Sequence, residues 1–229
     1  MKKSKAILMA LCAVLLVAAS VMGTLAYLTS TDEVVNTFTV GNVAITLDEV
    51  QVNANGTPVE DAARVRENTY KLLPGHTYTK DPTVHVTTGS EDCYLFVKVV
   101  NEIAAIEDPS NTIASQMTAN GWAVVDADNG IYVYGTAAAP TAVSANRDVV
   151  VFENFTILGT VTNDQLAGHP VDPDHPDGEL VPGYEGAKVV VTAYAVQKDG
   201  FENEPASYIW GETFGKTATT PTTDPAVAG

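Results

Sequence analysis

Short stretches of alternating apolar and polar residues, separated by turn signals, recur along most of this chain. Residues 38–47 and 83–87 alternate with a period of two, which is typical of strands with one buried face. Residues 94–100 are almost entirely apolar, which predicts a central strand buried on both faces. Strands of this length and spacing, with few helical periods between them, predict an all-β sandwich or barrel.

Other segments carry strand signals too, and one pair is typical of a hairpin around Asp128-Asn129-Gly130. The further expected strands are residues 49–52, continuing or following the first strand, and residues 69–73, 122–125, 131–134, 149–158 and 189–196. Turns are expected at Asn55-Gly56 and Pro74-Gly75. Short helices are expected at residues 110–120, with Ser110 or Asn111 as N-cap, and at residues 201–214.

The N-terminus has the layout of a secretory leader. Three lysines within the first five residues precede a long apolar stretch, and Thr24 and Ala26 are small residues where a signal peptidase reads the chain. We therefore expect a signal peptide at residues 1–26, cut between Ala26 and Tyr27, and an exported mature protein. Residues 6–28 are also long enough to span a bilayer, so an uncleaved anchor is the alternative.

Three blocks of residues, in this order, carry a family resemblance. They are Ala26-Tyr27 with Asn36-Thr37-Phe38-Thr39-Val40-Gly41 and the strand 43–47; Leu73-Pro74-Gly75 with Lys80–Val84 and Cys93–Val99; and Val189–Gln197 with Gly200-Phe201. Together they resemble the TasA/camelysin family, secreted proteins of Gram-positive bacteria whose leaders are cut by a SipW-type signal peptidase. The resemblance implies a jelly-roll-like β-sandwich with a few short helices in the connections.

The resemblance also implies a role as a structural subunit of biofilm-matrix fibres, secreted to the extracellular matrix or the cell surface. The expected organisation is a single domain at residues 27–215 that starts with a strand segment at 27–40. Residues 216–229, rich in Thr, Pro and Ala, are expected to be a disordered tail. The expected partners are other copies of the chain, a SipW-type signal peptidase and other matrix proteins.

Residues 27–40 are the candidate for assembly, because cleavage would free an extended segment that can add as a strand to the next copy. Val34, Val35, Phe38 and Val40 are the candidate side chains for this donor strand. Such a head-to-tail contact does not close, so it builds a filament. The alternative is that residues 27–40 fold back as an edge strand of their own subunit.

The charge of the chain excludes one class of partner. The sequence has 12 Lys and Arg against 28 Asp and Glu, and loss of the three leader lysines leaves 9 against 28, a net charge of −19. A chain this acidic does not bind nucleic acid or an anionic membrane by charge. The many acidic residues are consistent with binding of divalent cations, and also with a charged surface that is simply exposed to solvent.

One loop concentrates potential metal ligands. It contains His169, Asp172, Asp174, His175, Asp177 and Glu179. The carboxylates suit a hard cation and the imidazoles a borderline metal such as zinc. The spacing is not that of an EF-hand, and a solvated loop is the alternative, so a divalent cation is the only cofactor considered.

No enzymatic motif is visible. The chain lacks His-Glu-x-x-His and Gly-x-Ser-x-Gly, so we assign no catalytic residue and expect a protein that is not an enzyme. The resemblance leaves a camelysin-like cell-surface metalloprotease as the alternative, and a monomeric binding module is a third. Cys93, the cysteine that stays after loss of Cys12 with the leader, is expected to be a buried small side chain without a disulfide. His76 and His85 are expected to be surface residues rather than ligands.

Overall fold

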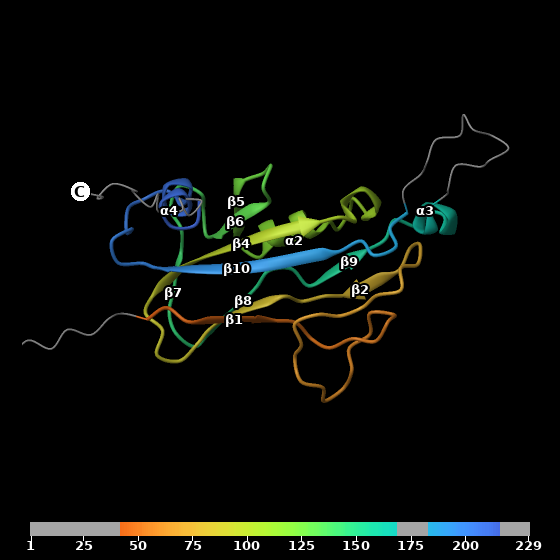
Figure 1. Ribbon diagram of the computed structural model, residues 1–229, viewed down its shortest axis with the longest axis horizontal. Coiled ribbons are helices and arrows are strands. Elements are labelled where there is room, and N and C mark those ends of the chain that lie inside the picture. The colour runs from red at the N-terminus through yellow and green to blue at the C-terminus, as the bar shows by residue number, and fades with distance from the viewer. Residues whose placement is uncertain (1–41, 169–182, 216–229) are drawn as a thin grey trace, which may run out of the picture. The chain divides into compact units, whose positions relative to one another are not determined.

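A computed structural model describes residues 42–168 and 183–215. They form antiparallel sheets joined by loops and short helices (Figure 1). The expected leader, the cleavage site at Ala26-Tyr27, the donor side chains Val34, Val35, Phe38 and Val40, the loop at 169–179 and the tail lie outside the described residues. Predictions about them stay predictions.

Within residues 42–168 and 183–215, the β structure consists of two main sheets and one two-stranded sheet. The first has the order β1 (Ile45–Asp48), β3 (Thr83–Val86), β8 (Arg147–Val150). The second has the order β10 (Val189–Gln197), β4 (Cys93–Asn101), β6 (Ile131–Tyr134), β5 (Trp122–Asp126), and β7 (Ala142–Val143) also pairs with β4. The third pairs β2 (Thr77–Thr79) with β9 (Asn154–Thr156).

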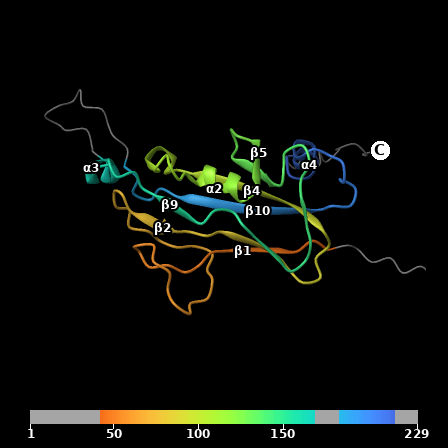
Figure 2. The same ribbon diagram turned by 180° about the vertical axis from the view of Figure 1, so that it is seen from behind.

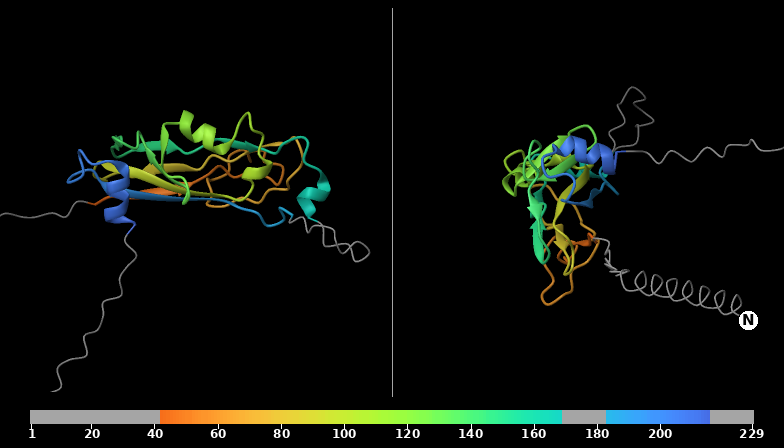
Figure 3. Two further views of the ribbon diagram at one scale, coloured as in Figure 1. Left: turned by 90° about the horizontal axis from the view of Figure 1, so that it is seen from above. Right: turned by 90° about the vertical axis from the view of Figure 1, so that its left-hand side faces the viewer.

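The sheets curl around one apolar core, as the end-on view in Figure 3 shows. Strand β4 is central to it and is buried on both faces. Leu95 and Val97 point into the main core, while Tyr94 and Phe96 face a second cluster on the other side of the sheet. Since successive strand residues point to opposite faces, a nearly unbroken apolar strand fits a position with cover on both sides.

The described residues contain four short helical segments: η1 (Ala104–Ile106), α2 (Ile113–Ala119) and α3 (Asn163–Ala167) in connections between strands, and α4 (Ala206–Thr213) after the last strand. The last of these, α4, covers the outer face of the second sheet, where the Trp210 ring lies 5.6 Å from Phe96 and 5.1 Å from Tyr194 between centroids. Among the described residues, no helix is long and apolar enough to cross a membrane.

The structure confirms the all-β fold with short helices in the connections. The expected central strand, the hairpin around Asp128-Asn129-Gly130, the strand at 189–196 and both turns are also present. The strand expected at 149–158 is wrong in one respect, because it divides into β8 and β9 in different sheets. Val151 and Phe152 are both fully buried, and two successive inward side chains break the alternation of a single pleated strand.

Three smaller predictions are wrong. Residues 69–73 form no strand, because Lys71 N donates to Ala54 O and Leu73 N to the Tyr78 hydroxyl instead of to a neighbouring strand. Residues 49–52 form only isolated bridges. Helix α2 begins later than expected and is capped by Thr112, because Asp108 accepts both the amide and the hydroxyl of Ser110 in a preceding turn.

Candidate functional site

A large groove runs between the two main sheets at their β1 and β10 edges. It encloses about 1450 Å³ and is lined by β1, by residues 66–73 and by residues 184–193. Within the part of the chain that the structure covers, β1 pairs only with β3 and β10 only with β4. The two strands run beside one another in Figures 1 and 2 without being hydrogen-bonded to each other. The groove is therefore bordered by two exposed strand edges, which are templates for pairing with another strand.

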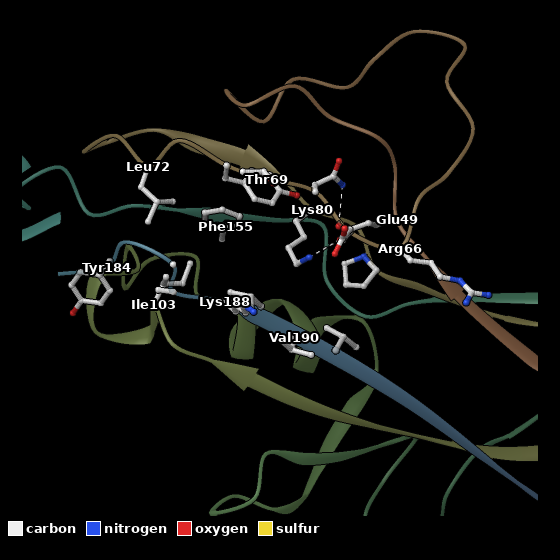
Figure 4. A pocket seen from close by; sticks show the side chains of 18 of the residues that line it. Glu49, Arg66, Thr69, Leu72, Lys80, Ile103, Phe155, Tyr184, Lys188 and Val190 are labelled. Atoms are coloured by element: carbon white, nitrogen blue, oxygen red, sulfur yellow. Dashed lines mark hydrogen bonds and ion pairs between the residues drawn. The ribbon is translucent and has the colours of Figure 1, made fainter. Parts of the chain in front are cut away.

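One end of the groove is apolar. Figure 4 shows Leu72, Ile103, Phe155 and Tyr184 gathered there. Ile103 and Phe155 belong to the main core, and Leu72 and Tyr184 are half-buried against it. The groove is thus continuous with the core, and an apolar side chain placed at this end would be removed from water.

The other end holds a buried ion pair. Lys80 Nζ lies 2.6 Å from Glu49 Oε2, and their side chains are only 12% and 5% exposed. Asn68 Nδ2 donates to Glu49 Oε1 at 2.9 Å, and Asn68 Oδ1 accepts the amide of Val52. Both oxygens of the buried Glu49 carboxylate therefore have a polar partner, and Figure 4 shows the contact between Glu49 and Lys80.

A second charged cluster braces the wall formed by β1. Arg64 donates to the carboxylates of Asp48 and Asp81, and the His85 Nε2 lies 2.9 Å from Asp48 Oδ1. Burial opposes the charge on Asp48, but hydrogen bonds from Arg64 and His85 outweigh it and lower the pKa of this carboxyl. Burial likewise opposes the charge on His85, but bonds to Asp148 and Asp48 outweigh it and raise the pKa of the imidazole.

None of the described residues that line the groove was predicted as a site residue from the sequence. The candidate metal ligands His169, Asp172, Asp174, His175, Asp177 and Glu179 lie outside the described residues. Within residues 42–168 and 183–215, no group of three or more His, Cys, Asp and Glu side chains could hold a metal ion. Cys93 is fully buried, as predicted, and burial followed by the nearby Asp92 raises the pKa of its thiol to about 11.

Sequence reasoning missed the groove itself. Two of its walls come from residues 45–49 and 188–193. These ranges are far apart in the sequence, so no local pattern predicts the groove. His85 lies on the polar side of its strand, as expected, but its bridging of two carboxylates depends on strands that are distant in sequence. The sequence signal for this role is a titratable side chain among threonines on the polar side of an alternating strand.

The comparisons with known proteins add no relative. No family model matches the chain, and neither a curated protein nor a solved structure matches it. The family resemblance therefore rests on the sequence blocks quoted above.

Proposed function

We propose that this protein is a secreted structural subunit of extracellular matrix fibres. Residues 27–40 of one mature copy lie as a strand in the groove between β1 and β10 of the next copy. The observation that carries the proposal is this groove, with an unpaired strand edge on each side and an apolar end continuous with the core. An inserted strand would pair with one of these two edges.

The energies of such a contact are adequate. Each main-chain hydrogen bond along an inserted strand contributes about 0.5–1.5 kcal/mol net. Burial of one large side chain such as Phe38 adds roughly 1.5–3 kcal/mol. Several such hydrogen bonds and the burial of one or two such side chains offset the repulsion between acidic subunits once salt screens it.

The competing arrangement is that residues 27–40 occupy the groove of their own subunit. That arrangement gives a monomer whose N-terminal segment is protected, whereas strand donation gives a filament. The metalloprotease alternative gains no support from the described residues, which bring no metal-ligand set together.

The test compares two purified chains, one starting at Tyr27 and one starting at Gly41. We expect light scattering and negative-stain electron microscopy to show filaments only for the longer chain. Equal thermal melting of the two chains as monomers is the control that the shorter one is folded. The proposal fails if the chain from Gly41 makes filaments as readily, or if the chain from Tyr27 stays monomeric with residues 27–40 resistant to protease. N-terminal sequencing of exported material checks the cut at Ala26-Tyr27.

A further inference from the structure

We propose that the groove selects its occupant by charge, with Arg66 and Lys188 receiving Asp32 and Glu33 of the neighbouring copy. This inference rests on the proposed function and specifies which residues make the contact and in which direction the donor segment lies.

The groove is less acidic than the chain as a whole. It is lined by four of the 12 Lys and Arg residues in a sequence with 28 Asp and Glu: Arg66, Lys71, Lys80 and Lys188. Lys80 is occupied by Glu49. Arg66, Lys71 and Lys188 are exposed, and their side chains form no ion pair or hydrogen bond with any residue that the structure describes.

Four acidic residues also line the groove, and two of them are already paired. Asp48 is held by Arg64 and His85, and Glu49 by Lys80. Glu67 and Glu185 also line the groove, but neither forms an ion pair within the described residues. Among the described residues, this leaves three unpaired cations against two unpaired carboxylates in the groove, so Arg66 and Lys188 offer an acidic segment a more favourable site than the rest of this acidic chain does.

The N-terminal segment has the complementary composition. Residues 27–40 contain Asp32 and Glu33 and no Lys or Arg, followed by Phe38 and Val40. The tail at 216–229 is a poorer occupant, because it has one Lys, one Asp and no aromatic side chain. Of these two segments, the N-terminal one alone combines an acidic pair with an aromatic side chain.

The charged and apolar parts also follow one another in a matching order along the groove and along the segment. Figure 4 places Arg66 at the end with Glu49 and Lys80, and Tyr184 and Leu72 at the other end, with Lys188 between. In an extended strand, Glu33 and Phe38 lie about 17 Å apart. We place the acidic pair toward Arg66 and Lys188 and Phe38 toward Tyr184, with Asp32 on the same face of the strand as Phe38 and Glu33 on the opposite face.

A charge-reversal experiment tests this inference with chains that start at Tyr27. One variant, D32K/E33K, has a basic donor segment and the parental groove. The other, R66E/K188E, has the parental donor segment and an acidic groove. Each variant alone sets like charges against each other, so we expect its rate of filament growth to fall by at least about tenfold. An equal mixture should recover growth, because each donor then meets an oppositely charged groove in the other variant.

Matched controls separate the inference from the proposed function. The variant K98E/K198E makes the same charge change at lysines that do not line the groove, and we expect it to grow like the parent. Normal thermal melting shows that each variant is folded. Growth of either variant alone at the parental rate, or a mixture that stays monomeric, overturns the charge-selective contact while strand donation stands. Failure of the parental chain itself to form filaments overturns both.

Discussion

His85 and Asp148 join neighbouring strands through a 2.6 Å contact between Nδ1 and Oδ1. The other ring nitrogen, Nε2, lies 2.9 Å from Asp48 on β1. Because both ring nitrogens face carboxylate oxygens, only the protonated imidazole can donate to both. The protonated form therefore ties together β1, β3 and β8, which are the three strands of the sheet that ends at the groove.

This arrangement predicts a pH dependence of folding stability. The pKa of His85 is raised above its ordinary value of 6.5, so its contribution is complete below pH 6.5 and is lost as the pH rises through the folded pKa. The pKa of Asp48 is lowered from 3.8, so its contribution is present above pH 3.8 and is lost as the pH falls through the folded pKa. Denaturant unfolding across this range should show greatest stability in mildly acidic buffer.

His85→Gln removes the titrating group and should flatten the alkaline side of this profile. We expect it to lower the free energy of unfolding in mildly acidic buffer by roughly 1–2 kcal/mol, since the lost bonds are charge-assisted but partly exposed. Replacement of Lys98, which lies in the other main sheet, is the matched control. A parental profile that rises from pH 6.5 upward would contradict this prediction.

The Glu49–Lys80 pair predicts a non-additive pair of substitutions. Lys80→Met leaves the Glu49 carboxylate buried without its cation, which should cost about 3–5 kcal/mol. The double variant E49Q/K80M should recover most of that loss, because the substituted amide keeps an oxygen to accept from Asn68 and carries no charge. Denaturant unfolding of the parent, both single variants and the double variant measures the coupling. Equal losses for Lys80→Met and for E49Q/K80M would contradict it.

The sequence was sufficient for elements whose local pattern decides their structure. The unbroken apolar run around Leu95 identifies β4, and Asp128-Asn129-Gly130 identifies the β5–β6 turn, where Gly130 has a φ of +65°. The local sequence pattern did not predict the structure correctly where tertiary contacts decide the course of the chain. Residues 151 and 152 lie within an apolar run that resembles one strand, and only the surrounding sheets decide that it divides.

The groove depends on such tertiary contacts entirely. From the sequence alone, Arg66 and Lys188 are two unrelated charged residues, because no local pattern indicates that positions so far apart line one groove. Only the pairing of β1 with β3 and of β10 with β4 leaves two edges facing one space. Residue patterns identified a donor segment, and the structure was needed to find an acceptor.

Metal removal tests the loop at residues 169–179. The core contains a full complement of buried apolar side chains, and residues 42–168 and 183–215 contain no metal-ligand set, so we expect the same melting temperature with and without EDTA. A structural cation that contributed about 2–4 kcal/mol would shift melting by about ten degrees in a domain of this size. A shift of that size, reversed by added Ca²⁺ or Zn²⁺, would identify His169, Asp172 and their neighbours as ligands.

Blocking the groove should convert the protein into a terminator of filament growth. Ala193 is half-buried on the inner face of β10 and lines the groove, so Ala193→Trp fills space that a donor strand needs. A chain with this change keeps residues 27–40 and can donate but not accept. Small amounts added to the parental chain should shorten filaments, as measured by negative-stain microscopy. Val124→Trp, at an exposed position of β5 that does not line the groove, is the matched control.

The chain from Gly41 should terminate growth in the complementary way, because it accepts a donor segment but has none to give. Combining the truncation with Ala193→Trp removes both functions, so this chain should leave filament length unchanged at every ratio tested. That outcome depends on a contact with two different faces, in which one end of each subunit donates and the other accepts. If the doubly altered chain shortened filaments as strongly as either single change, the head-to-tail arrangement would be wrong.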